Sequence, residues 1–149
     1  MAIARTAAPA AKAILKQATA LKPLRGKASD GLLPSLAHQK QNPTSDHNTG
    51  FAADLTHDPV FGFNGHDVYK HLQADKRVKY IIFNGKIWSK ERGELPYKGP
   101  NPHKHHVHIS IKETCGYDTS PWFPWMGKPT LVNKVKSAVK PLPKKKVTK

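Results

Sequence analysis

The pattern of apolar and polar positions predicts two helices. Between about residues 10 and 21, apolar residues recur at helical spacing with lysines between them, at Ile14, Leu15, Ala18 and Leu21. Pro23 ends this pattern, so a short amphipathic helix is predicted there. A second helix is predicted to begin near residues 65–67 and to run to Gln73.

Four other runs predict strands. Residues 51–55 are apolar except for Asp54, as expected of a buried strand, and residues 106–112 alternate between polar and apolar. Two β-rich runs flank the dipeptide Asn84-Gly85, which is typical of a hairpin with a tight turn. Residues 31–49 and 93–102 are predicted to be loops. Together these elements predict a small single α+β domain over residues 10–125, with an antiparallel sheet and a few flanking helices.

Size and composition exclude several classes of protein. The 149 residues suffice for one domain with tails but not for two full domains. No apolar run approaches the ~18 residues needed to span a bilayer, so no transmembrane segment is expected. Cys115 is the only cysteine, which excludes an intramolecular disulfide and a multi-cysteine zinc site. Any metal would have to be bound by histidine and carboxylate.

The positive charge of the chain lies at its two ends. The formal net charge is +15, yet residues 42–125 carry ten Lys and Arg against nine acidic residues. Residues 1–41 carry seven basic residues and one acid, and residues 126–149 carry eight lysines and no acid. Such flanks bind polyanions in general, including nucleic acid, anionic envelope polymers and membrane surfaces, or they serve only solubility.

The first 20 residues do not resemble a secretory signal. They are rich in alanine, but Arg5, Lys12 and Lys16 interrupt the apolar run that such a signal needs. We therefore expect the protein to be made and kept in the cytoplasm unless another system releases it.

Four of the nine histidines lie within residues 103–108. On a strand, side chains two apart share a face, so His106 and His108 are predicted to lie together with Ser110. The apolar residues between them, Val107, Ile109 and Ile111, would then face the core. A polar strand face or a histidine-rich loop without chemistry remains the alternative interpretation.

A second group of chemical residues lies upstream. His47 is predicted to leave a loop and Asp54 to lie on the strand that follows, with Gly50 and two alanines between them. Small residues let the backbone approach a ligand or a neighbouring strand closely, so both side chains can reach one point. With one histidine of residues 106–108 they would form a His, Asp, His set, which suits catalytic zinc with a fourth position for water.

These residues carry a resemblance to a known family. The run Ser45-x-His47-x-x-Gly50-x-Ala52-x-Asp54 resembles the SxHxxGxAxD signature of zinc peptidases that include D-alanyl-D-alanine carboxypeptidases and phage L-alanyl-D-glutamate endolysin peptidases. His106-Val107-His108 is similar to the HxH motif of the wider group that joins these peptidases to lysostaphin and the hedgehog domain. The resemblance covers about residues 24–125. It divides the chain into an N-terminal basic helix or extension (1–23), a zinc peptidase domain (24–125) and a basic flexible tail (126–149).

The resemblance implies a role for each matched residue. His47, Asp54 and His108 would bind one Zn²⁺, and His106 would be the general base or would stabilise the oxyanion. Many relatives have a carboxylate three residues before the last ligand, where this chain has His105. In the alternative register, His106 binds the metal and His103 is the base. Ser45 could orient a ligand or contact substrate.

The function implied is hydrolysis of peptide bonds in bacterial peptidoglycan stem peptides by a phage endolysin or a virion-associated wall hydrolase. We expect a monomer that is made in the host cytoplasm, acts in the wall or from the virion, and is held on anionic wall polymers by its basic flanks. Trp88, Tyr97, Trp122 and Trp125 could line a substrate groove, although residues 121–125 are more typical of a strap packed on the domain.

Two alternative functions are kept. One is a non-enzymatic, basic nucleic-acid-binding or virion structural protein on a degenerate peptidase fold. The other is a two-histidine RNA phosphoesterase, for which His108-Ile109-Ser110-Ile111 has the required unit, whereas residues 47–50 have the wrong flanking positions.

Overall fold

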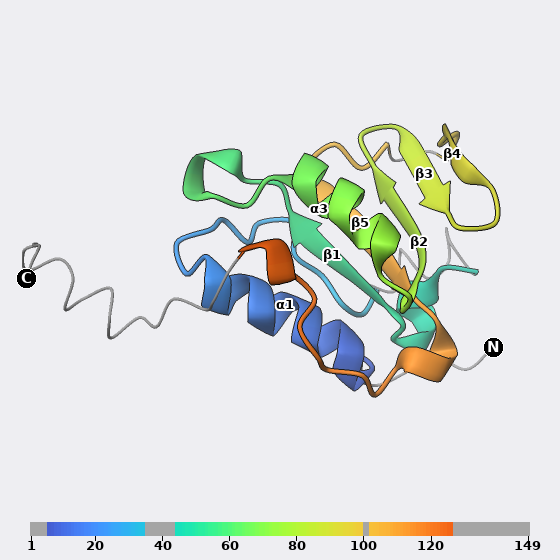
Figure 1. Cartoon of the computed structure of the whole chain (residues 1–149), viewed down its shortest axis with the longest axis horizontal. Helices are drawn as coiled ribbons and strands as arrows, with labels where there is room; N and C mark the ends of the chain where they lie inside the picture. Colours follow the sequence, from blue (N-terminus) through green and yellow to red (C-terminus); the bar gives the residue numbers. More distant parts are fainter. Residues whose placement is uncertain (1–5, 35–43, 100–101, 127–149) are drawn as a thin grey trace, which may run out of the picture.

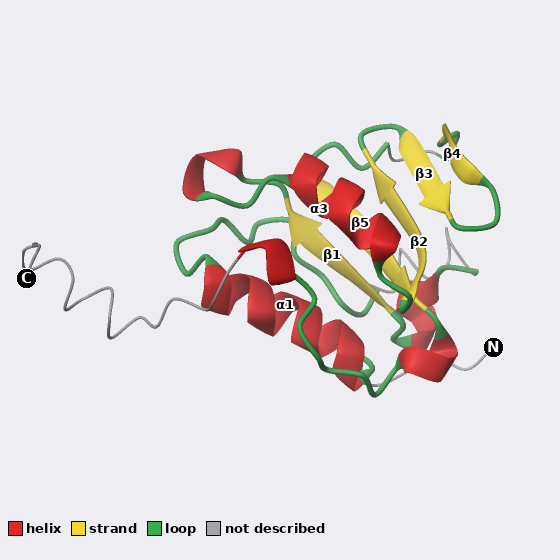
Figure 2. Cartoon of the chain, in the orientation of Figure 1, coloured by secondary structure: helices red, strands yellow, loops and turns green. Residues whose placement is uncertain are grey.

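The computed structural model describes residues 6–34, 44–99 and 102–126, and His38 and the predicted tail after Met126 lie outside these ranges. Within them, five strands form one antiparallel sheet in the order β1-β5-β2-β3-β4 (Figures 1 and 2). The strands are β1 (Ala52–Thr56), β2 (Val78–Phe83), β3 (Lys86–Ser89), β4 (Gly93–Pro96) and β5 (His106–Ile111). The α-helices in this part of the chain are α1 (Pro9–Leu21) and α3 (Gly65–His71). The predicted small α+β domain is confirmed.

Short 3₁₀ helices connect these elements. They are η1 (Asp46–Thr49), η2 (Pro59–Phe61), η3 (Leu72–Ala74), η4 (Glu113–Cys115) and η5 (Pro124–Met126). No helix among the described residues combines the length and the apolar character needed to cross a membrane.

The register of the three neighbouring strands β1, β5 and β2 gives the sheet two different faces. Ala53 pairs with Ile109, which pairs with Ile81, and all three are fully buried in the hydrophobic core. One residue further along β1, Asp54 pairs with His108. Because side chains alternate along a strand, this second row projects from the opposite face. The candidate chemistry therefore lies on the face away from the core.

Helix α1 is part of the folded domain. Ala10, Ile14 and Ala18 have no exposed surface and belong to the same core as Leu55 and Val107 of the sheet. Their spacing of four places them on one side of the helix, as the apolar pattern predicts. The segment assigned to an extension before residue 24 thus contributes directly to the core.

The predicted hairpin is confirmed, and its geometry matches the sequence signal. Asn84 and Gly85 both have positive φ, 52° and 77°, as two-residue turns between twisted strands require. Part of the next prediction is wrong, because Gly93–Pro96 forms β4 where a loop is expected from residues 93–102. This short edge strand is mostly exposed and has no apolar alternation, so only its backbone pairing with β3 identifies it.

Residues 121–125 form the predicted strap over the domain. Trp122 and Phe123 are buried, so the prediction that Trp122 lines a substrate groove is wrong. Arg77 lies over the Trp122 ring, 3.6 Å from its centre, and donates hydrogen bonds to the carbonyl oxygens of Ser120 and Pro121. A cation on an aromatic face and charged hydrogen bonds to carbonyls both stabilise the strap. Nothing in the local sequence around Arg77 indicates this role.

His57 anchors the start of α3. Its Nδ1 accepts a hydrogen bond of 2.8 Å from the backbone N–H of Gly65, one of the amides that a helix leaves unpaired at its N-terminus. Partial burial, together with the neighbouring His66, lowers the pKa of His57. An Nδ1 that accepts this bond must be neutral, so protonation would break the contact.

We expect this contact to make folding stability depend on pH. The pKa of His57 is lower in the folded protein than in the unfolded chain, where it is about 6.5. The stabilisation by this contact is therefore complete above the unfolded pKa and is lost as pH falls through the folded pKa. Asn at position 57 offers an amide oxygen that does not titrate. Thermal unfolding of wild type and His57→Asn between about pH 7 and pH 5 should therefore show a smaller loss of Tm for the variant. Equal slopes would contradict this role.

Candidate metal centre

Pairing between β1 and β5 sets two of the three predicted ligands side by side. Asp54 lies opposite His108, and its Oδ1 is 3.2 Å from His108 Nδ1. The backbone of Asp54 is also paired on its other side, since its N–H donates to the Gly31 carbonyl at 2.8 Å and its own carbonyl accepts from Gly31 N–H. This carboxylate is therefore held on a backbone fixed from both sides.

The turn η1 brings His47 to the same point. The Ser45 hydroxyl accepts from the His47 N–H at the start of η1, which gives Ser45 a local capping role. Gly50 ends η1 with φ of 82°, and a Cβ there would lie 2.9 Å from the Thr6 carbonyl oxygen. Glycine is required by both facts. The chain then enters β1 with His47 Nε2 only 3.1 Å from Asp54 Oδ1.

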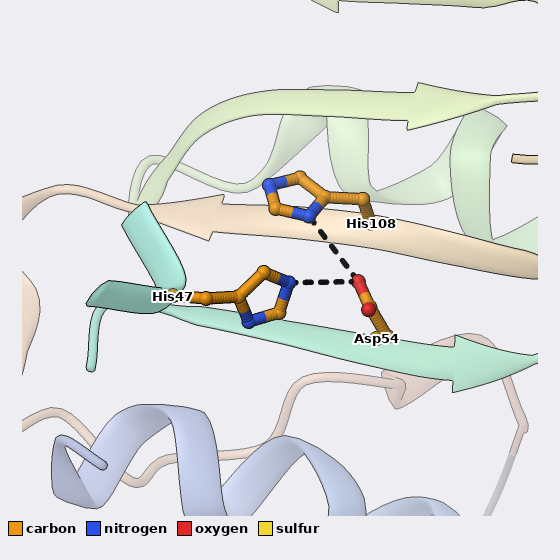
Figure 3. Close-up of side chains that lie close together, drawn as sticks. All are labelled: His47, Asp54 and His108. Carbon is orange, nitrogen blue, oxygen red and sulfur yellow. Dashed lines mark hydrogen bonds and ion pairs between the residues drawn. The ribbon is translucent and has the colours of Figure 1, made fainter. Parts of the chain in front are cut away.

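Both imidazoles face the Asp54 carboxylate (Figure 3), and a hydrogen bond on the far side of each ring orients it. The Leu32 carbonyl is 2.8 Å from His47 Nδ1 and can only accept, so Nδ1 carries the proton and Nε2 faces Asp54. His108 Nε2 lies 2.8 Å from Ser110 Oγ, which leaves Nδ1 toward Asp54. Ligating histidines are typically held through the second ring nitrogen in this way.

The three side chains together can hold a metal ion. One ligand atom from each of His47, Asp54 and His108 lies within 4.8 Å of the other two. Two imidazole nitrogens and a carboxylate oxygen are a donor set suited to first-row transition metals such as zinc. The set predicted from the sequence is thus brought together.

Electrostatics at the cluster favour a cation. Burial alone would raise the pKa of Asp54, but hydrogen bonds and charge from His108 and His47 hold it well below its usual range. Burial opposes protonation of His47, yet the hydrogen bond and charge of Asp54 outweigh it and raise the pKa of His47. A proton on His47 thus balances the carboxylate, and a metal ion would compete for the same position.

His106 stands next to this cluster. Its Nε2 is 3.6 Å from Asp54 Oδ2, on the same side of β5 as His108. Burial, reinforced by His108 and His47 and opposed by Asp54, lowers the pKa of His106. The three predicted ligands and His106 line one cavity of about 280 Å³. Tyr80, Tyr97 and His103 also line this cavity. A molecule bound in this cavity would therefore contact both the ligand cluster and His106.

The loop before β5 places His103 and His105 differently. The His103 ring lies 4.7 Å from that of His106 and 5.7 Å from that of His108. His103 has a positive φ of 59°, and its carbonyl accepts from the Asn84 N–H of the hairpin turn. His105 is exposed, does not line the cavity, and uses its carbonyl to pair with His57 N–H. His103 is thus retained as a site candidate and His105 is not.

Two features of the site escaped the sequence analysis. The Tyr80 ring stacks on the His108 ring with the two ring centres 5.5 Å apart, and burial raises the pKa of Tyr80 to about 12. Ser110 lies on the predicted polar face, but the sequence does not predict its hydrogen bond to His108, and both side chains are buried. The sequence indicates only that Tyr80 and Ile82 share a face of β2. The register of the sheet, which pairs Tyr80 with Ser110 and Ile82 with His108, puts that face at the site.

Replacement of Ser110 by alanine should weaken metal binding. The change removes the partner of His108 Nε2, and loss of such outer hydrogen bonds costs metal affinity by about 10–100-fold. Competition with a chromophoric chelator would measure this, with Ser89→Ala as a control outside the cavity. Unchanged affinity in a folded Ser110→Ala protein would show that the hydroxyl does not orient the ligand.

Comparisons of the chain with protein-family models, with curated proteins and with solved structures found no match. The class of protein is therefore assigned from the fold and the site alone. It is an α+β protein whose five-stranded antiparallel sheet carries a histidine–aspartate–histidine cluster able to hold a metal ion.

Proposed function

We propose that the protein is a zinc-dependent peptidase. The observation that carries the proposal is the convergence of His47 Nε2, Asp54 Oδ1 and His108 Nδ1 beside a further histidine, within one cavity. A fixed N, N, O set with an open side is the arrangement of catalytic rather than structural zinc sites.

Each residue has a part in the proposed reaction. A zinc ion held by His47, Asp54 and His108 would supply Lewis acidity and lower the pKa of a bound water to about 7. His106, neutral because its pKa is lowered, accepts a proton from the attacking water and returns it to the amine as the C–N bond breaks. Leu32 and Ser110 keep the ligand rings in place.

The proposed substrate is the stem peptide of bacterial peptidoglycan. Support comes from the resemblance of residues 45–54 and 106–108 to the wall-peptidase motifs and from the basic flanks, which suit an anionic wall. An endolysin or a virion-associated hydrolase, acting as a monomer, is the corresponding proposal for its biological role.

The phosphoesterase alternative is less well supported by the geometry. Such an enzyme needs its serine or threonine to face the substrate beside histidine. Ser110 has no exposed surface, and its hydroxyl is engaged with His108 Nε2. The cavity therefore presents the histidines and Asp54 but not this serine.

Metal removal and replacement test the proposal. We expect the purified protein to contain about one zinc per chain, in line with a single three-ligand cluster, and to reduce the turbidity of a peptidoglycan suspension. A chelator should abolish clearing, and added zinc should restore it. Released amino groups, rather than reducing sugars, would identify peptide hydrolysis. Zinc binding without clearing would leave the non-enzymatic alternative, and absence of both would overturn the metal site as well.

A further inference from the structure

Three large apolar side chains are exposed on two loops that contact each other and do not line the cavity of the metal centre. Leu24 follows α1, and Val60 and Phe61 lie on η2, with exposed fractions of 72%, 83% and 53%. We call this surface the two-loop tip. Both loops lie at the same end of the molecule, where the chain leaves α1 and where it leaves β1 (Figure 1).

The two loops are fixed to each other. The Gly26 N–H donates to Asp58 Oδ2 at 2.7 Å, and the Lys22 side chain lies against Gly62, which ends η2 with φ of 87°. Pro59 at the start of η2 restricts the turn further. The apolar side chains are thus held outward on a rigid support rather than collapsed onto the domain.

Charge around the tip is positive. Lys22, Arg25 and Lys27 stand against Asp30 and Asp58 in the two loops. The buried Arg25 neutralises Asp30, and Asp58 keeps its charge while it accepts from the Gly26 N–H. Lys22 flanks the tip and Lys27 is exposed beside it. The strap that precedes the end of the described chain also packs near the tip, since the Phe123 ring lies 5.7 Å from that of Phe63, two residues after Phe61. The sequence beyond Met126 carries eight lysines and no acid.

We infer that the two-loop tip binds the surface of an anionic lipid bilayer, with Leu24, Val60 and Phe61 entering the interface and lysines contacting the headgroups. Apolar side chains that enter the interface and a basic segment are two signals whose combination gives stable attachment where one alone is marginal. The charge next to the tip distinguishes it from an ordinary scattered apolar residue. This inference is independent of the proposed peptidase activity.

Vesicle binding by the full chain tests the inference. The probes are vesicles of phosphatidylcholine alone and of phosphatidylcholine with phosphatidylglycerol, sedimented at low salt and at about 1 M NaCl, where screening shortens the Debye length to about 3 Å. High salt suppresses binding by the lysines and leaves the apolar part. We expect wild type to prefer the anionic vesicles and to retain measurable binding to them at high salt.

Substitutions in the tip should remove the binding to anionic vesicles that remains at high salt. Phe61→Ser and Val60→Ser should each lower the high-salt partition coefficient by about tenfold, as expected from the lost transfer of one large apolar side chain. Tyr117→Ser is the matched control, since Tyr117 is 89% exposed and follows Gly116, whose carbonyl binds Ala10 at the other end of α1. Far-UV circular dichroism and Tm would confirm that each variant is folded.

Three results would overturn the inference. They are absence of binding to anionic vesicles, equal high-salt binding by wild type and both tip variants, or an equal loss in Tyr117→Ser. Sedimentation with purified peptidoglycan is the parallel measurement. Weaker binding of the tip variants to peptidoglycan, with unchanged binding to vesicles, would assign the surface to the wall polymer instead.

Discussion

Replacing Asp54 with asparagine should lower metal affinity by more than about 100-fold, beyond the range found for loss of outer hydrogen bonds alone. Asp54 is the only anion of the ligand cluster, and its Oδ1 is the atom on which both His47 and His108 converge. Asparagine keeps the shape but removes the charge that attracts a cation. Metal content after dialysis and chelator competition would measure the effect.

The same variant should change the titration of His47. Without the carboxylate, burial becomes the dominant influence, and the pKa of His47 should fall below its ordinary value instead of lying above it. NMR titration of the metal-free proteins would detect the change of direction. Asp67→Asn, on the exposed first turn of α3, is the control. Metal binding by Asp54→Asn at wild-type affinity would rule out the cluster as the site.

Replacing His106 with alanine should abolish most activity while leaving the metal in place. General acid–base groups contribute about 10²–10⁴-fold to rate, and His106 is the histidine nearest the ligand cluster that is not needed to complete it. In this variant, the zinc content should therefore stay at the wild-type value while the rate of amine release from peptidoglycan falls. His71→Ala, which removes a ring stacked on Trp125 outside the cavity, is the control.

His103→Ala distinguishes the two possible assignments. If His108 is the third ligand and His106 the base, His103→Ala should retain metal and a larger share of activity than His106→Ala. If instead His106→Ala loses zinc while His103→Ala keeps zinc and loses activity, the alternative register holds. The left-handed backbone at His103 and its ring contact with His106 make this comparison necessary.

Most of the candidate ligand set could be predicted because the spacing of its residues is a local property, whereas the choice of His108 over His106 as the third ligand rested on the motif resemblance. Alternation along residues 106–111 fixes which side chains share a face, and Gly50 with two alanines allows His47 to approach Asp54. The hairpin at Asn84-Gly85 was predictable for the same reason, since a two-residue turn with positive φ admits few residue types.

The remaining parts of the site depend on contacts between distant segments. Ligand orientation requires the Leu32 carbonyl, fifteen residues before His47, and the pairing of Asp54 with His108, which are 54 positions apart. The strand β4 and the membership of α1 in the core are likewise decided by pairing and packing with other elements.

The sequence by itself therefore determined the α+β class, most element positions and the His, Asp, His set. Only the tertiary structure decided which ring nitrogens face the carboxylate, that His103 rather than His105 lines the cavity, and that the loop after α1 is hydrogen-bonded to the loop after β1. The physical reason is that periodicity and turn chemistry act over a few residues. Strand register and loop packing instead depend on the free energy of contacts that local sequence does not encode.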